Sequence, residues 1–218
     1  MLRRSKRRQR LTVAITHKGE VELRLPGHMA VTTAEAFLAE QGAWIMAQLD
    51  AVNHRRRQRS HLLDGAMLPL LDRRLRLCLR RIHPARVRQV GGEIWAPLAL
   101  SADPEQLEAA LEQWYRQRAR HHLLPRLAHW AAILNLQVAS VSIRGPRTRW
   151  GSCSAQGRVN LNWRLMWLPE KVVDYVLIHE LCHRQHMNHS PAFWSLVEQY
   201  IPDWRLRRHQ LRQVAPLW

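Results

Sequence analysis

Two histidines four residues apart, with a glutamate directly after the first, are the residues of this chain best suited to chemistry. They form the segment His179-Glu180-Leu181-Cys182-His183. Because a helix repeats about every 3.6 residues, His179 and His183 share one face and can direct two imidazoles at one metal ion. Glu180 lies about 100° round the helix, where it can reach a water on that metal. The spacing therefore predicts a catalytic metal site with Glu180 as its general base.

A catalytic zinc site needs a third protein ligand, and the residues after the motif offer three candidates. His189 is preferred because Asn188 suits the end of one helix and Ser190 the cap of the next. His189 is therefore expected in a tight turn that can return over the first helix. The alternatives are His186 and Glu198. If His186 is not a ligand, we expect it to be a surface histidine or a hydrogen-bond donor to the substrate.

The sequence around the motif predicts a buried helix followed by a turn and a second helix. Pro169 suits the first turn of the first helix, and Pro191 suits the first turn of the second, over residues 192–200. The first helix carries apolar residues on two adjacent faces, so it is expected to be buried. Buried histidines need a partner, which a metal provides. Cys182 is expected to point away from the metal into the core.

These motifs resemble the YgjP-like metallopeptidase family, which is related to the SprT and WLM zinc-protease groups. The matching residues are 149–154, 157–165, Pro169, 174–176, the 179–183 motif, 188–190, Phe193-Trp194 and 202–204. The resemblance is dense over residues 140–210 and looser before them. It implies a zinc-dependent, peptidase-like domain in which His179, His183 and His189 bind the metal. Some relatives are described as nucleotide pyrophosphatases, so the resemblance does not decide the reaction.

Hydrophobic patterning predicts an α+β fold with a β-rich N-terminal region and a zincin-like catalytic region. We assign residues 1–100, with one helix, to the β-rich region and residues 101–218 to the catalytic region. The boundary is soft, because the two regions could share one core. The expected strands are 11–16 and 21–25 around Lys18-Gly19, then 68–71, 75–79, 86–90, 93–96, 138–143 and 158–163. Besides the two helices above, a helix is expected at residues 34–49, followed by a connector at 53–61. A long helix is expected to begin at Asp103-Pro104, and Pro125 is expected to kink or restart it. The motif helix is expected beside a small sheet.

Substrate binding is expected near the strand at 158–163. In many zinc peptidases a strand beside the metal helix pairs with extended substrate backbone. The resemblance indicates that residues 159–162 or the loop at 150–154 does so here. The candidate substrate-binding residues are Arg149, Trp150, Asn160, Asn162, Arg164 and His186. The two arginines suit an oxyanion, a carboxylate or a phosphate, but equally a structural ion pair, and the tryptophan suits a core.

The chain is strongly basic, with 34 Lys and Arg against 17 Asp and Glu and a net charge of +17. Such a charge attracts polyanions. It indicates nucleic acid, a ribosome or an acidic or phosphorylated substrate as a partner, or else a protein that uses arginine at solvated positions. The densest runs lie at residues 3–10 and 55–59. No compact nucleic-acid-binding motif accompanies them.

Composition favours a cytoplasmic protein that is not associated with a membrane. Apolar residues make up 46% of the chain, enough for a core. No apolar run approaches the roughly 18 residues that a membrane span needs. The basic N-terminus leads into an alternating segment without the apolar region of a signal peptide. The scattered cysteines Cys78, Cys153 and Cys182 are expected to be reduced thiols.

The sequence thus predicts a zinc-dependent hydrolase, foremost a metallopeptidase that acts on protein or peptide through a metal-bound water and Glu180. The first alternative is a metal-dependent nucleoside triphosphate pyrophosphatase or phosphohydrolase, which the basic charge favours. Three imidazoles suit zinc better than the oxygen-loving metals of phosphate chemistry, so this alternative ranks second. The second alternative is a nucleic-acid-associated adaptor with a structural zinc. An open coordination position beside Glu180 argues against it.

Overall fold

The computed structural model describes residues 2–5, 10–16, 20–27, 29–59 and 62–214. The chain divides into two compact units between residues 61 and 62. This division lies well before the boundary expected near residue 100. The reason is a set of contacts inside the second unit, where the Tyr115 hydroxyl donates to the backbone oxygen of Pro69 at 2.6 Å. The strands before residue 100 therefore share a core with the helix that follows them.

The first unit contains one three-stranded sheet and two helices. Its elements are β1 (Leu2–Ser5), β2 (Thr12–Ile15), β3 (Val21–Pro26), α1 (Val31–Glu40) and α2 (Gly42–Arg59). β3 is the central strand, antiparallel to β2 and parallel to β1. The predicted hairpin is thus confirmed, although its turn at Lys18-Gly19 lies outside the described residues. The single helix expected at 34–49 is wrong: two helices meet at Gln41 and Gly42, and glycine is a poor helix former.

The second unit begins with a four-stranded sheet of order β4-β5-β7-β6. Its strands are β4 (Met67–Leu70), β5 (Arg73–Arg80), β6 (Arg88–Val90) and β7 (Glu93–Pro97), followed by a 3-10 turn, η1 (Leu98–Ala102). The long helix α3 (Pro104–Ile133) follows, and Asp103 caps it by accepting from the backbone of Glu105 at 3.0 Å. Pro125 lies inside α3, so the helix does not restart there.

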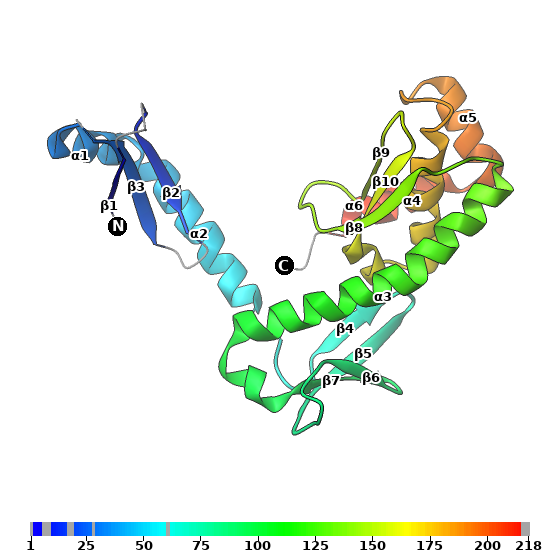
Figure 1. Ribbon diagram of the computed structural model, residues 1–218, viewed down its shortest axis with the longest axis horizontal. Coiled ribbons are helices and arrows are strands. Elements are labelled where there is room, and N and C mark those ends of the chain that lie inside the picture. Colours follow the sequence, from blue (N-terminus) through cyan, green and yellow to red (C-terminus); the bar gives the residue numbers. More distant parts are fainter. Residues whose placement is uncertain (1, 6–9, 17–19, 28, 60–61, 215–218) are drawn as a thin grey trace. The chain divides into compact units, whose positions relative to one another are not determined.

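A second sheet and three helices complete the unit. The elements are β8 (Ser140–Arg144), β9 (Gly151–Cys153), β10 (Arg158–Asn162), η2 (Trp163–Trp167), α4 (Glu170–Cys182), α5 (Pro191–Tyr200) and α6 (Trp204–Gln213). The strand order is β8-β10-β9, with β10 parallel to β8 and antiparallel to β9. Figure 1 shows α3 running between this sheet and the four-stranded sheet. The second unit is therefore built around α3.

Charged side chains fix α4 against α3. Asp174 of α4 is buried and accepts hydrogen bonds from Arg126, at 2.7 Å, and from the indole of Trp130, at 2.8 Å. Arg126 also pairs with Glu170 in the first turn of α4, at 3.1 Å. A buried carboxylate with several donors resists displacement, because breaking the network leaves a buried charge without a partner. The helix that carries the histidine motif is therefore held rigidly.

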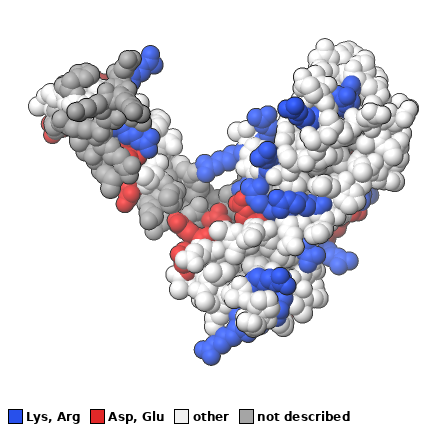
Figure 2. All heavy atoms as spheres, viewed as in Figure 1, with Lys and Arg blue, Asp and Glu red and all other residues white. Residues whose placement is uncertain are grey.

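Two surface properties bear on possible partners. Among the described residues, no helix is both long enough and apolar enough to cross a membrane. Figure 2 shows Lys and Arg side chains in several separate groups on the visible face of the second unit. Separate groups do not define one continuous binding stripe on this face.

Candidate metal centre

Three histidine side chains converge where α4 ends. His179 lies in the last turn of α4, His183 is its C-cap, and His189 comes from the turn before α5. The ring centroids are 5.0, 4.9 and 5.0 Å apart, a nearly equilateral triangle. One nitrogen from each ring lies within 4.8 Å of the other two. The Nε2 atoms of His179 and His189 approach each other to 3.1 Å.

This geometry fits a shared metal ion. Tetrahedral zinc with bonds of about 2.0–2.1 Å holds its ligand nitrogens roughly 3.3 Å apart, close to the separation of the two Nε2 atoms. Burial, followed by the charges of His183 and His189, lowers the pKa of His179 to about 3. Burial also lowers the pKa of His189. Both rings are thus neutral near pH 7, the form that binds a metal.

The surrounding residues orient the rings. The backbone oxygen of His186 lies 3.0 Å from Nδ1 of His183, which leaves Nε2 of His183 to face the cluster. Phe193 is fully buried and packs against all three imidazoles, with centroid distances of 4.9, 4.7 and 4.9 Å. The backbone of Phe193 donates to Ser190 Oγ at the predicted helix cap. Phe193 therefore provides the apolar surface against which the three imidazoles pack.

The two alternative ligands do not join this cluster. Glu198 is exposed on α5, and its carboxylate accepts from Arg205 at 2.8 Å. His186 contributes its backbone oxygen to His183, as described above. Over residues 62–214, the cluster of His, Cys, Asp and Glu side chains able to hold a metal consists of His179, His183 and His189.

Glu180 lies beside the cluster with its side chain buried. Burial raises the pKa of Glu180 from its ordinary value of 4.5 to about 8, and the positive charge of Arg149 opposes this shift. The carboxylate packs against β9: a Cβ added to Gly151 would stand 2.6 Å from Oε1 of Glu180. A carboxyl group with a pKa near neutrality is suited to both accepting and donating a proton.

The strand order decides which segment has a free edge beside Glu180. β10, which contains residues 159–162, lies between β8 and β9, so both of its edges are occupied. The segment 150–154, expected to be a loop, contains the edge strand β9. Of the two segments considered for pairing with a substrate, the second is therefore the one that can accept another strand.

The two asparagines of β10 have structural partners. Asn160 accepts from Ser142 Oγ at 2.6 Å and donates to Ser152 Oγ at 3.1 Å, which joins the three strands side by side. Asn162 is buried, donates to the backbone oxygens of Pro146 and Arg149, and accepts from the backbone of Arg164. Asn162 therefore fixes the loop that leads into β9.

The candidate arginines differ in their surroundings. Arg164 is buried, with its guanidinium 4.4 Å from the Trp163 ring centroid and 5.5 Å from that of Trp167. Arg149 is exposed and, together with Trp150, lines a cavity of about 340 Å³ that also contains His179 and Glu180. The other residues that line this cavity are Gly151, Tyr175, Val176, Arg208, Leu211 and Arg212.

Comparison with known proteins places this centre in a family. The family model of the YgjP-like metallopeptidase domain matches residues 9–214. The chain belongs to the YgjP-like family. Among solved structures, the "metallopeptidase zymogen of Pyrococcus abyssi abylysin" is 30% identical, with a TM-score of 0.36, over 39% of this chain and 87% of that chain. A comparison with curated proteins finds no match.

Membership of the YgjP-like family supports a metal-dependent hydrolase, and the histidine cluster is a group that could hold the metal. Three polar residues that line the cavity of this YgjP-like chain, Tyr175, Arg208 and Arg212, were not predicted from the sequence. Tyr175 lies one helical turn before His179, with ring centroids 5.8 Å apart. That spacing of four was a usable signal, whereas the two arginines lie on α6, a helix that was not predicted from the sequence.

Proposed function

We propose that this protein is a zinc-dependent metallopeptidase in which His179, His183 and His189 hold the metal and Glu180 is the general base. The observation that carries the proposal is the triangle of imidazoles with the buried carboxylate of Glu180 beside it, where His179 and Glu180 line one cavity. Three nitrogen ligands and a fourth, open position are typical of catalytic rather than structural zinc. The same count argues against an adaptor with a structural zinc, which normally has four protein ligands.

The chemistry then divides between the metal and the protein. When held by three imidazoles, zinc supplies Lewis-acid polarisation of a carbonyl and activation of a water molecule. Glu180 takes the proton of the attacking water and passes it to the leaving amine. Its burial keeps competing solvent away. Phe193 and the backbone oxygen of His186 hold the imidazoles in place throughout.

Strand β9 is suited to presenting a peptide to Glu180. Trp150 and Ser154 flank β9 and direct their backbone groups toward β10. The amide of Asn162 donates to the backbone oxygen of Trp150, and the amide of Ser154 donates to that of Arg158. Backbone groups alternate in direction along a strand, so those of Gly151 and Cys153 point to the free edge. A peptide that pairs with them forms a further strand of the sheet, with its backbone next to Glu180. This arrangement favours a polypeptide substrate over a small molecule.

The second candidate function is hydrolysis of a nucleoside triphosphate. Arg149, Arg208 and Arg212 favour it, because they line the cavity of Glu180 and arginine binds phosphate well. One zinc-loaded sample should be offered an unfolded protein and, separately, nucleoside triphosphates. We expect cleavage of the protein and no release of phosphate or pyrophosphate. Turnover of the nucleotides alone would replace the first proposal with the second.

A further inference from the structure

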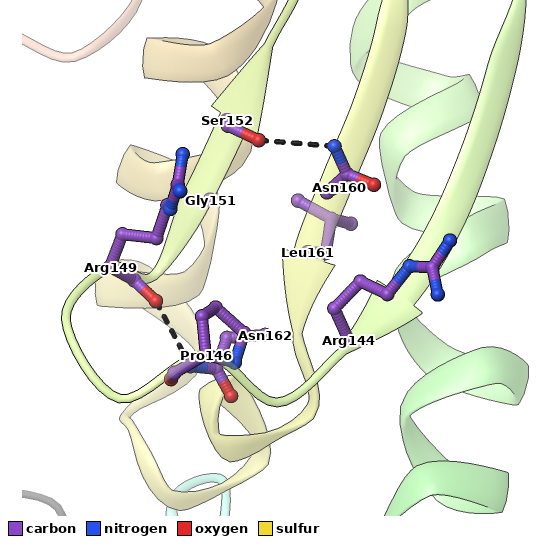
Figure 3. A pocket seen from close by; sticks show the side chains of 8 residues that line it. All are labelled: Arg144, Pro146, Arg149, Gly151, Ser152, Asn160, Leu161 and Asn162. Carbon is purple, nitrogen blue, oxygen red and sulfur yellow. Dashed lines mark hydrogen bonds between the residues drawn. The ribbon is translucent and has the colours of Figure 1, made fainter. Parts of the chain in front are cut away.

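Two cavities adjoin β9. A Cβ on Gly151 would point at Glu180 in the first, whereas the next residue, Ser152, lines the second, so the two cavities lie on opposite faces of the strand. The first is the cavity of Glu180, on the α4 side. The second, of about 250 Å³, is lined by Arg144, Arg149, Ser152 and Asn160 among others. Figure 3 shows Arg144 and Arg149 on either side of Asn160, which is hydrogen-bonded to Ser152. Arg149 and Gly151 line both cavities.

Both cavities are positively charged and short of carboxylates. Arg208 and Arg212 line the first, Arg144 lines the second, and Arg149 lines both. Glu180 is the acidic residue in the lining of the first, and the lining of the second has none. Over the described part of the chain, no carboxylate forms an ion pair with any of these four arginines. They are therefore available to an anionic ligand.

Neighbouring side chains hold two of these arginines in position. The Arg208 guanidinium lies 5.0 Å from the centroid of Trp194, which stacks on Trp204 at 4.2 Å and on His189 at 5.5 Å. The Nε atom of Arg144 donates to Ser142 Oγ at 3.2 Å. A guanidinium fixed by stacking or by a hydrogen bond loses less freedom when it binds a carboxylate. Arg208 is thus preorganised in the first cavity, whereas Arg144 is held on β8, which β10 separates from β9.

An extended peptide on β9 would meet both cavities at once. Successive side chains of a strand point to opposite faces of its sheet. Side chains at alternate positions of a paired peptide therefore enter the cavity of Glu180, and those between them enter the second cavity on the side lined by Arg149 and Ser152. Both cavities offer arginines, so a run of acidic residues would satisfy both. We infer that the substrate is an acidic polypeptide segment, bound in extended form along β9 with Asp and Glu side chains in the two arginine-lined cavities.

This inference rests on the proposed peptidase function, so its test separates binding from cleavage. Two fluorescent peptides of equal length are compared, one with a run of Glu and one with Gln at the same positions. Binding is measured on zinc-loaded Glu180→Gln protein, which should bind without cleaving. We expect the Glu peptide to bind at least tenfold more tightly at low salt, with a preference that weakens as salt rises.

Substitutions then assign the preference to the cavities. In the Glu180→Gln background, Arg208→Gln and Arg149→Gln should each lower the Glu-to-Gln affinity ratio about twofold to fivefold, as expected for loss of an ion pair that stays partly solvated. Arg120→Gln, at an exposed arginine on α3 that lines neither cavity, makes the same change of charge and should leave the ratio unchanged.

Two results would overturn the inference. One is equal affinity of the two peptides for the Glu180→Gln protein. The other is a preference for Glu that Arg120→Gln lowers as much as Arg208→Gln, because that would show a general effect of charge. A nucleoside triphosphate that binds more tightly than the Glu peptide and is lost in Arg208→Gln would assign the arginines to phosphate instead. Failure of the wild-type protein to cleave either peptide, with the binding preference intact, would refute the peptidase function alone.

Discussion

The carboxylate of Glu180 lies directly against the backbone of Gly151, so that even a methyl group at Gly151 would meet it. A Cβ built there would stand 2.6 Å from Oε1 and 2.7 Å from Cγ of Glu180. Real Cβ atoms essentially never approach another atom so closely. The lack of a side chain at position 151 therefore allows the strand edge and the proposed base to occupy adjacent space.

Gly151→Ala should lower kcat for peptide cleavage about a hundredfold, because displacement of a catalytic group by about 1 Å has an effect of that size. Zinc affinity should stay within a few-fold of wild type, since the histidines lie on other elements. Steady-state kinetics and zinc titration check the two expectations. Gly92→Ala is the matched control, because a Cβ there meets no atom within 4 Å. Full activity in Gly151→Ala would show that Glu180 does not need its present position.

Alanine substitutions at two nearby histidines, His189 and His186, test the assignment of the third ligand. His189→Ala should weaken zinc binding at least a hundredfold, because the side chain of His189 completes the triangle. His186→Ala should remain near wild type, since His186 contributes a backbone oxygen that alanine keeps. Competition titration with a zinc chelator measures both. Tight binding in His189→Ala would move the assignment to His186 or Glu198.

The raised pKa of Glu180 predicts a pH-dependent stability of the metal-free protein. The pKa of Glu180 is 4.5 ordinarily and about 8 in the folded state, so between these values the folded state binds more protons than the unfolded state. The free energy of unfolding therefore falls as pH rises through this window. Glu180→Gln removes this loss, so its advantage over wild type should grow from pH 5 to pH 8 by on the order of 3 kcal/mol.

Urea unfolding of chelator-treated protein at several pH values measures this difference. Glu198→Gln is the control, because it makes the same substitution at an exposed position. The contributions of the histidines are common to all three proteins and cancel in the comparison. An advantage of Glu180→Gln that stays constant from pH 5 to pH 8 would show that Glu180 titrates normally.

The basic charge predicts salt-dependent binding of nucleic acid. If the net charge of +17 recruits a polyanion, affinity should fall steeply with salt, because each neutralised phosphate releases counterions. Removing the charges of the runs at 3–10 and 55–59 should flatten that slope and leave zinc binding intact. Fluorescence anisotropy with a labelled oligonucleotide at several salt concentrations checks this. Absence of binding at about 0.15 M salt would indicate that the arginines only occupy solvated surface positions and do not bind a polyanion.

Local signals allowed the convergence of the three histidines to be predicted from the sequence. Helical spacing brought His179 and His183 to one face, and Ser190 marked the start of α5. His189 was consequently placed in a turn between two helices, where the structure has it. These features depend on residues close together in the chain. Asp103 at the start of α3 and the hairpin of β2 and β3 were predictable for the same reason.

The missed features depend on contacts between distant residues. β9 is only three residues long and contains Gly151, which has little strand propensity, so it forms because β10 lies beside it. The central position of β10 is likewise a property of the sheet order. α6 carries few apolar residues, and Trp204 is its buried one. Its arginines reach the cavity through packing that no local pattern records.

The most direct test compares wild type and Glu180→Gln for zinc content and peptide cleavage in the same preparations. The account predicts one zinc per chain in both proteins and loss of at least about a hundredfold in kcat for Glu180→Gln, since a general base contributes about 10²–10⁴ to the rate. Zinc should be absent from His179→Ala, which controls for the site. A Glu180→Gln protein that keeps its zinc and cleaves the peptide at the wild-type rate would contradict the account.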